Sequence, residues 1–285
     1  MEEKKMTEGK KKIALVTGAN RGIGLELTKK LIENDWEVVA LIRSGFPGEE
    51  RELQQKIHQR IIRIYRADLS DFTKLKSALE QIKELEPKLD ALFNNAGGSF
   101  PELLFSPQGR ELHYEVQTVV PYIITMELLE LLKKGSPGIV IQTSSDAFRF
   151  RKTFEPEELA KPKKFQKLTG PYTSTKLAIT LWTHALAPKL KREGITIISV
   201  DPGNNNTMRK GRNGGLPLLI QPFIRFFGPH PSVGAGRLFA GLKRTPEEAG
   251  LYFSKGKPAE YKFKQHASQV LFQVRTVYEK EFISL

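Results

Sequence analysis

Near its N-terminus the chain reads Thr17-Gly18-Ala19-Asn20-Arg21-Gly22-Ile23-Gly24, between a short apolar run and a segment of helical periodicity. Residues 13–16 before this stretch predict a buried strand, and residues 25–32 after it predict a helix. Strand, glycine-rich turn and helix in this order are the context that a dinucleotide-binding turn requires. In such a turn Gly18 permits the tight bend, Gly22 lets the backbone approach a pyrophosphate, and Gly24 lets helix and strand pack closely. The N–H groups at the start of the helix would then face the phosphates.

A purely structural glycine loop is the alternative, but a second apolar run follows at the distance expected for the next strand. Apolar runs and helical patterns then alternate along the chain. The predicted strands are residues 13–16, 37–42, 60–66, 89–93, 138–143, 195–200 and 250–253, and the predicted helices are 25–32, 71–86, 109–134, 171–193 and 232–242. This alternation predicts an α/β fold: a Rossmann-like, doubly wound domain with a mostly parallel sheet of about seven strands and helices on both faces.

Residues 1–11 are highly charged and are expected to form a disordered lead-in to one dinucleotide-binding catalytic domain, residues 12–285. Two segments interrupt the alternation, residues 147–169 and residues 204–231. Each follows the C-terminal end of a predicted strand, which is where parallel sheets bind their ligands. Both segments are therefore expected on the substrate side of the site.

Composition excludes several classes of protein. The 285 residues are 39% hydrophobic, enough for a substantial core, and no apolar run is long enough to span a membrane. The N-terminus has no apolar signal region, so a cytoplasmic protein is expected. Cysteine is absent, which excludes disulfides and cysteine-ligated metal, and the five histidines show no metal-ligand spacing. We expect no metal site.

The net charge of +13 leaves three kinds of partner open: nucleic acid, an anionic membrane surface, and a phosphate-rich cofactor. The positive charge is scattered, with local clusters at residues 10–12 and 161–167. No RNA-binding or helix-turn-helix signature accompanies it, so nucleic acid is not expected as a partner. Peripheral contact with a membrane remains a hypothesis.

Tyr172 and Lys176 stand four residues apart in Gly170-Pro171-Tyr172-Thr173-Ser174-Thr175-Lys176. This spacing places both side chains on one face of a helix. A neighbouring ammonium group stabilises a phenolate, so we expect Lys176 to lower the pKa of Tyr172. A tyrosine adjusted in this way can give or take a proton near neutral pH. An ordinary helix surface is the alternative, because this spacing is common.

The order of several motifs resembles that of the short-chain dehydrogenase/reductase family. They are residues 17–24, Asp68-Leu69, Asn94-Asn95-Ala96-Gly97, Ser144-Ser145, Tyr172 with Lys176, and Pro202-Gly203 with Thr207. The resemblance covers about residues 12 to 255. Within the family the chain is most similar to the retinol dehydrogenase and WW-domain-oxidoreductase-like branch. Residues 250–254 and the long gap from Ser145 to Tyr172 carry this narrower similarity.

The resemblance implies a role for each matched residue. Tyr172 would be the acid and base of a carbonyl/alcohol interconversion, Lys176 would lower its pKa and bind the nicotinamide ribose, and Ser145 would orient the substrate oxygen. The residues implied in cofactor binding are Gly18, Asn20, Arg21, Gly22, Ile23, Gly24, Arg43, Asp68, Leu69, Asn95, Ala96, Gly97, Tyr172, Lys176, Pro202, Gly203 and Thr207. Asp68 is alternatively the N-cap of the helix that follows, a role that Ser70 or Asp71 could also fill.

The end of the second strand indicates which dinucleotide binds. An acidic residue there would bind the ribose 2′-hydroxyl of NAD(H) and repel a 2′-phosphate. Residues 41–44 read Leu-Ile-Arg-Ser and contain no acid. Arg21 and Arg43 could both donate charge-assisted hydrogen bonds to a 2′-phosphate. NADP(H) is therefore favoured over NAD(H).

One position departs from the family pattern. Gln117 stands where the family usually has an asparagine, whose backbone carbonyl holds a water in a proton relay to the lysine. Gln117 keeps that carbonyl, but its longer side chain could repack the site. Gln117 is therefore included among the catalytic candidates. A cofactor-binding regulatory or scaffold protein with weak or lost activity is the alternative to an active enzyme.

The substrate is expected to be a small hydrophobic carbonyl or alcohol. Residues 216–227 are apolar and could form a lid, contact a membrane, or pack on the core. An epimerase or dehydratase acting on a nucleotide sugar would reuse Tyr172 and Lys176. However, about 80 residues after Pro202 leave little room for a separate substrate domain. Members of the family often form dimers or tetramers, so a homo-oligomer also stays open.

Overall fold

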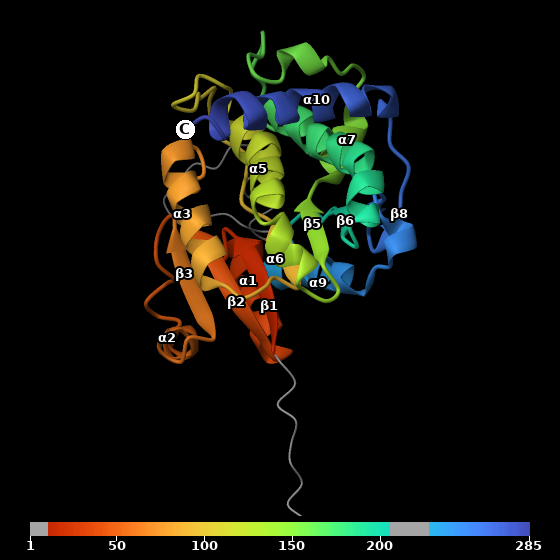
Figure 1. The fold of residues 1–285 in the computed structure, drawn as a ribbon. Helices are drawn as coiled ribbons and strands as arrows, with labels where there is room; N and C mark the ends of the chain where they lie inside the picture. The colour runs from red at the N-terminus through yellow and green to blue at the C-terminus, as the bar shows by residue number, and fades with distance from the viewer. Residues whose placement is uncertain (1–10, 206–227) are drawn as a thin grey trace, which may run out of the picture.

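A single eight-stranded sheet organises the computed structural model, which describes residues 11–205 and 228–285 (Figure 1). The strand order is β3-β2-β1-β4-β5-β6-β7-β8, and every pairing is parallel except that of β7 with β8. The strands are β1 Lys12–Thr17, β2 Trp36–Ile42, β3 Ile62–Arg66, β4 Ala91–Asn94, β5 Ile139–Thr143, β6 Thr196–Val200, β7 Tyr252–Ser254 and β8 Lys257–Pro258. The predicted doubly wound α/β fold is confirmed, and the antiparallel strand β8 adds to the seven strands that the sequence indicated.

Helices cover both faces of this sheet. The α-helices are α1 Gly22–Glu33, α2 Arg51–His58, α3 Phe72–Leu85, α4 Leu112–Tyr114, α5 Val120–Glu127, α6 Leu129–Lys133, α7 Pro171–Arg192, α9 Pro231–Ala240 and α10 Ala267–Val277. Shorter turns include the π-helix η1 Glu115–Val119, the 3-10 helices η2 Asp146–Phe150 and η3 Pro156–Glu158, and the C-terminal π-helix η7 Tyr278–Phe282. The sequence analysis did not predict α2 or α10.

Successive residues of each strand point to opposite faces, so two apolar layers form. Leu15, Leu92 and Val140 lie in the layer beneath α3, α5, α7 and α10. Ala14 and Phe93 belong to the opposite layer, beneath α1 and α9. Figure 1 shows α5 and α7 crossing the near face of the sheet. Because strands buried on both faces read as continuous apolar runs, their positions could be predicted well.

The predicted continuous helix over residues 109–134 is wrong. The segment begins at Leu112, passes through η1 and breaks at Leu128 before α6 begins. Pro121 explains the irregular turn, because proline has no N–H to donate to the carbonyl of Gln117 four residues earlier. The α-helical hydrogen bond cannot form there, and one π-helical turn precedes the proline.

The C-terminal ends of β1, β4, β5 and β6 meet at one edge of the sheet, and strand order reverses between β1 and β4. Ligands of doubly wound sheets bind at such a reversal. Thr17 ends β1, Asn94 ends β4 and Thr143 ends β5. The glycine turn and the serine pair follow directly on two of these strand ends. No helix in residues 11–205 or 228–285 is long and apolar enough to cross a membrane.

Candidate active site

The turn between β1 and α1 requires its glycines. Gly18 and Gly22 have φ values of +67° and +51°, a conformation that side chains strongly disfavour. A Cβ atom at Gly24 would lie 2.1 Å from the carbonyl oxygen of Gly18. The first turn of α1 therefore lies directly against the end of β1, with its N–H groups at the sheet edge. Arg21 precedes the helix in an extended conformation with an exposed side chain, and Ile23 is half-buried.

A second turn packs against the first. The hydroxyl of Thr17 accepts hydrogen bonds from the N–H groups of Asn95 and Ala96, both at 2.9 Å. The Asn95 side chain donates in return to the carbonyl of Thr17 at 3.0 Å. These bonds join the ends of β1 and β4, and they leave Gly97 exposed beside the glycine turn. The predicted cofactor residues Asn95, Ala96 and Gly97 thus form one surface with the glycine turn.

Asn20 connects the glycine turn to the end of β2. Its buried amide donates to the carbonyls of Ser44 and Gly45, both at 2.9 Å. Arg43 follows β2 directly, in the place where an acid would bind the ribose of NAD(H), and its guanidinium lies 3.4 Å from the carboxylate of Asp68. Arg43 and Asp68, two of the predicted cofactor residues, therefore contact each other.

Asp68 lies just beyond β3, and its carboxylate accepts hydrogen bonds from both the N–H and the hydroxyl of Ser70. Burial acts to raise the pKa of Asp68, but the hydrogen bonds from Ser70 and Arg43 outweigh it and lower that pKa. The N-cap of α3 is Asp71, which accepts from the N–H of Lys74. The alternative capping role of Asp68 is therefore wrong, and Leu69 packs half-buried at the margin of the core.

The serine pair ends β5, beside the start of α7. Ser144 is buried, and its hydroxyl donates to the carbonyl of Lys176 and shares a 2.7 Å hydrogen bond with Thr180. Ser144 therefore fastens α7 to the sheet. Ser145 is half-buried, its hydroxyl accepts from the N–H of Ala147 at 3.2 Å, and its nearby side chain acts to lower the pKa of Tyr172. Of the two serines, Ser145 is the one placed to meet a substrate oxygen.

Lys176 is buried beneath Tyr172. Its Nζ atom donates to the carbonyl of Thr143 at 2.7 Å and lies 6.0 Å from the centre of the Tyr172 ring. Burial lowers the pKa of Lys176 to about 7, although the charge of Asp201 acts to raise it. Burial thus disfavours the charged form of this lysine.

The expected lowering of the Tyr172 pKa is wrong. Burial raises the pKa of the phenol, the hydrogen bond from Ser145 acts to lower it, and the charge of Asp201 raises it further. Desolvation disfavours the phenolate more strongly than nearby groups favour it. The sequence could show the spacing of Tyr172 and Lys176, but it could not show that Lys176 is buried and Tyr172 half-buried.

Gln117 lies within η1, where the absence of an N–H on Pro121 removes the α-helical partner of its carbonyl. Its buried side chain donates to the carbonyl of Gly98 at 2.8 Å. Gln117 therefore supports the loop after β4 with its side chain.

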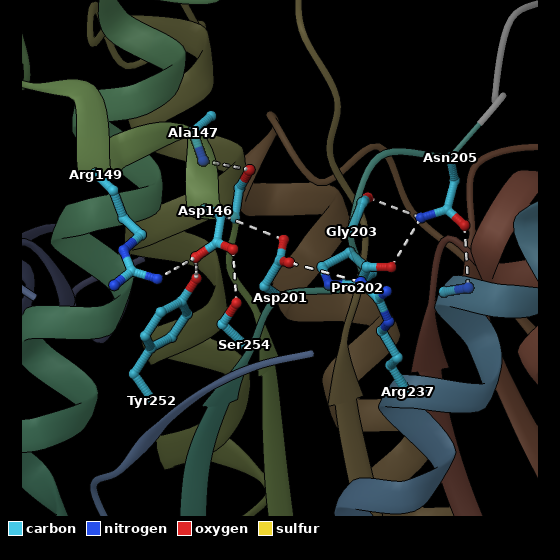
Figure 2. A network of polar contacts seen from close by, with 12 residues as sticks. Asp146, Ala147, Arg149, Asp201, Pro202, Gly203, Asn205, Arg237, Tyr252 and Ser254 are labelled. Atoms are coloured by element: carbon cyan, nitrogen blue, oxygen red, sulfur yellow. Dashed lines mark hydrogen bonds and ion pairs between the residues drawn. The ribbon is translucent and has the colours of Figure 1, made fainter. Parts of the chain in front are cut away.

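The sequence analysis did not single out Asp146 and Asp201, which Figure 2 shows at the ends of β5 and β6. Asp146 follows Ser145, and its carboxylate accepts from Tyr252 at 2.8 Å and Ser254 at 2.6 Å. Asp201 ends the run after β6, is 4% exposed, and accepts from the N–H of Asp146 at 3.1 Å. These contacts tie the turn that carries Ser145 to β6 and β7. Nothing in their sequence spacing, 55 residues apart, indicated the contact.

Pro202 and Gly203 continue from Asp201 along the same edge. Gly203 has a φ of +80°, and a Cβ there would lie 2.0 Å from the guanidinium of Arg237. The side chain of Asn205 donates to the carbonyls of Pro202 and Gly203, and it accepts from an N–H of α9 (Figure 2). Thr207 and the apolar segment 216–227 lie outside the described residues.

The geometry fits a dinucleotide. The glycine turn has no room for side chains, and the N–H groups of α1 lie where a diphosphate can accept from them. Gly18, Gly22 and Gly24 would hold the diphosphate, Asn95 to Gly97 the adenosine side, and Lys176 the nicotinamide ribose. Fold and site together define a doubly wound α/β protein with a dinucleotide turn and a Ser–Tyr–Lys group at the same sheet edge.

The chain belongs to the short chain dehydrogenase family, whose model matches residues 12–156. Retinol dehydrogenase 12 of Mus musculus is 31% identical over 249 residues, which cover 86% of this chain and 78% of that protein. Retinol dehydrogenase 14 of Homo sapiens is 28% identical, with 87% and 80% covered. The predicted family and its retinol dehydrogenase-like branch are confirmed.

Solved structures agree on the fold. An NADPH-bound carbonyl reductase from chicken fatty liver superposes with a TM-score of 0.65 over 88% of this chain and 99% of that chain, at 23% identity. The carbonyl reductase Sniffer of D. melanogaster gives a TM-score of 0.64 at 20% identity, with 88% of this chain and 100% of that chain covered.

Proposed function

We propose that this chain is an NADP(H)-dependent oxidoreductase that interconverts a hydrophobic aldehyde or ketone and its alcohol. The observation that carries the proposal is the convergence of Ser145, Tyr172 and Lys176 at the sheet edge that holds the glycine turn. The names of the relatives, retinol dehydrogenases, support an apolar alcohol or carbonyl as the substrate class.

Each of the three side chains has one task in this mechanism. Ser145 donates a hydrogen bond to the substrate oxygen and stabilises the charge that develops on it. Tyr172 gives its phenolic proton to that oxygen in reduction and takes the proton back in oxidation. Lys176 is anchored on Thr143 and keeps an amine beneath the phenol. Bound NADP(H) supplies or accepts the hydride.

A panel of carbonyls and alcohols, run with NADPH/NADP⁺ and NADH/NAD⁺ in parallel, tests activity, substrate polarity and cofactor together. Tyr172→Phe should reduce kcat by about a hundredfold or more, since it removes the proton donor. Tyr261→Phe is the matched control, because its hydroxyl has no hydrogen-bond partner among the described residues. Equal turnover in Tyr172→Phe and wild type would refute the mechanism.

The preference for NADP(H) is supported by the surroundings of Arg43. The side chain of Arg43 is 62% exposed, and its ion pair with Asp68 at 3.4 Å is a weak surface contact. A 2′-phosphate carries more charge than a carboxylate and can replace Asp68 as its partner. Asn20 holds the backbone after Arg43 against the glycine turn, which keeps this arginine near the ribose side.

We also propose that the protein is cytoplasmic and contacts an anionic membrane at its periphery. Phe150 is 86% exposed, only five residues after Ser145, and exposed Arg149 and Lys152 flank it. Arg151 fixes this segment to the start of α7 through the carbonyls of Thr169 and Gly170. An exposed aromatic ring among cations suits a lipid interface.

Sedimentation with phosphatidylserine vesicles tests this contact. Phe150→Asp should reduce the bound fraction, because it removes the apolar group and adds a negative charge. Phe272→Asp is the matched control, since Phe272 is also highly exposed, at 69%, but lies on α10. Equal losses in both variants, or none in either, would contradict the proposed location.

A second candidate function is a cofactor-binding regulatory protein with weak chemistry. The buried side chain of Gln117 favours it, because it occupies the position where the family usually has an asparagine. Tight NADPH binding by calorimetry, with no turnover across the whole panel, would support this function over catalysis.

A further inference from the structure

The loop after β4, residues 97–100, connects the cofactor turn to the substrate side of the site. Two side chains four residues apart hold it. Gln117 donates from Nε2 to the carbonyl of Gly98 at 2.8 Å, and the N–H of Phe100 donates to Nε2 of His113 at 2.8 Å. Both side chains are buried, with 1% of each residue exposed. The loop is thus held at two points, the carbonyl of Gly98 and the N–H of Phe100.

His113 can accept from Phe100 only in one protonation state. Its Nδ1 lies 2.6 Å from a carboxylate oxygen of Glu111, which is fully buried. Since Nε2 accepts from an N–H group, the ring proton must reside on Nδ1 and be donated to Glu111. The second oxygen of Glu111 accepts from the N–H of Tyr114 at 3.0 Å. Every polar atom of the Glu111–His113 pair therefore has a partner that fixes the imidazole ring.

The imidazole ring of His113 also contacts the rings of both Phe100 and Tyr172. The ring centres of Phe100 and His113 are 4.6 Å apart, and those of His113 and Tyr172 are 6.1 Å apart. Both contacts are edge-to-face, an arrangement that aromatic rings favour. Phe100 is half-buried, so part of the residue remains accessible.

Gln117 fits this arrangement because of Gly97. A Cβ atom at Gly97 would lie 2.6 Å from Oε1 of Gln117, so any other residue there would displace the amide. Gly97 also has a φ of +151°, which favours glycine. The long side chain at position 117 thus occupies the space beneath the loop and reaches Gly98.

We propose that Glu111, His113 and Gln117 are positioning residues that hold the loop 97–100, and that Phe100 forms an aromatic wall for the apolar group of the substrate. The inference rests on the proposed function and specifies it: the substrate carries a hydrophobic chain or ring next to its carbonyl group. The loop also carries Gly97 of the cofactor surface. The same positioning residues therefore hold both a cofactor contact and the proposed substrate contact.

Hydrogen exchange of a peptide covering residues 97–104 tests the support of the loop without any turnover. His113→Leu should accelerate exchange of the Phe100 amide about tenfold or more, because the amide loses its acceptor. His113→Gln, whose side-chain oxygen can replace Nε2, should restore part of the protection. His184→Leu, on an exposed position of α7, is the control and should change nothing in this peptide.

Gln117→Leu provides a second variant if His113→Leu does not fold, and it should accelerate exchange in the same peptide through loss of the contact with Gly98. Unchanged exchange in every folded variant would overturn the proposed support of the loop. This measurement stands even if the wild type reduces no carbonyl, so its failure is distinct from failure of the proposed function.

Kinetics with nonanal and propanal test the aromatic wall, because the two aldehydes differ only in their apolar chain. Phe100→Ala should raise KM for nonanal about tenfold and KM for propanal by much less. His113→Leu should show the same selectivity, and His113→Gln should recover part of it. If the wild type turns over neither aldehyde, quenching of retinol fluorescence gives the affinity for an apolar chain. Equal affinities in wild type and Phe100→Ala would refute the proposed contact between Phe100 and the apolar group of the substrate.

Discussion

Replacing Lys176 by methionine should stabilise the folded protein at neutral pH and abolish the proposed oxidoreductase activity. A pKa that falls from 10.5 to about 7 means that burial disfavours the charged lysine by about 5 kcal/mol, since one pKa unit is worth about 1.4 kcal/mol. Methionine fills similar space and carries no charge. It also loses the 2.7 Å hydrogen bond to the carbonyl of Thr143, which costs about 1–3 kcal/mol.

The sign of the pH dependence follows from proton binding. Between about pH 7 and 10.5 the unfolded chain binds a proton at Lys176 that the folded chain has largely released. The contribution of this lysine to the free energy of unfolding therefore rises with pH through that window. Lys176→Met lacks this dependence, so its advantage over wild type should shrink by about 3 kcal/mol between about pH 7 and pH 9.5. The lost hydrogen bond shifts the advantage by a constant and does not affect this change.

Urea unfolding of both proteins at the two pH values measures the change directly. Lys189→Met, at an exposed position of the same helix, is the matched control and should track the wild type at both pH values. A constant difference between Lys176→Met and wild type across the window would refute the reasoning, because it would mean that folding does not displace the proton of Lys176.

Three further substitutions test the cofactor site and the core. Gly24→Ala should abolish NADPH binding in calorimetry, because its Cβ would lie 2.1 Å from the Gly18 carbonyl; Gly236→Ala, whose Cβ would meet nothing within 4 Å, should bind normally. Arg43→Glu should lower the ratio of kcat/KM for NADPH over NADH by about tenfold or more, and an unchanged ratio would exclude Arg43 as the phosphate residue. Glu86→Gln should reduce the free energy of unfolding by about 3–5 kcal/mol in urea, because its buried carboxylate accepts from Arg63 and Tyr65; the exposed Glu84→Gln should lose little.

The strands and the glycine turn were predictable because their signals are local. Each buried parallel strand is a continuous apolar run. The turn needs glycine wherever φ is positive or another segment of the backbone approaches closely. The spacing of Tyr172 and Lys176 likewise shows their shared helix face without any tertiary contact. Pro121 could have predicted the break in the helical segment before α5, because it removes a donor that an α-helix needs.

The remaining features depend on contacts between distant segments. Arg43 and Asp68 each matched a separate cofactor role, and only the fold shows that they lie 3.4 Å apart. His113 is an isolated histidine in the sequence, and its importance comes from Glu111 and the loop after β4. The direction of the Tyr172 pKa also needs the fold, because burial rather than sequence spacing decides it.

Asp146 and Asp201 have opposite pKa shifts, and their hydrogen-bond donors explain the difference. Burial acts to raise the pKa of Asp146, but hydrogen bonds from Ser254 and Tyr252 outweigh it. Burial raises the pKa of Asp201, and the hydrogen bond from the backbone N–H of Asp146 lowers that pKa by less than burial raises it. The charge of Asp201 raises the pKa of both Lys176 and Tyr172. Ionised Asp201 therefore favours the state in which both residues hold their protons, and that is the state in which Tyr172 can protonate a carbonyl oxygen.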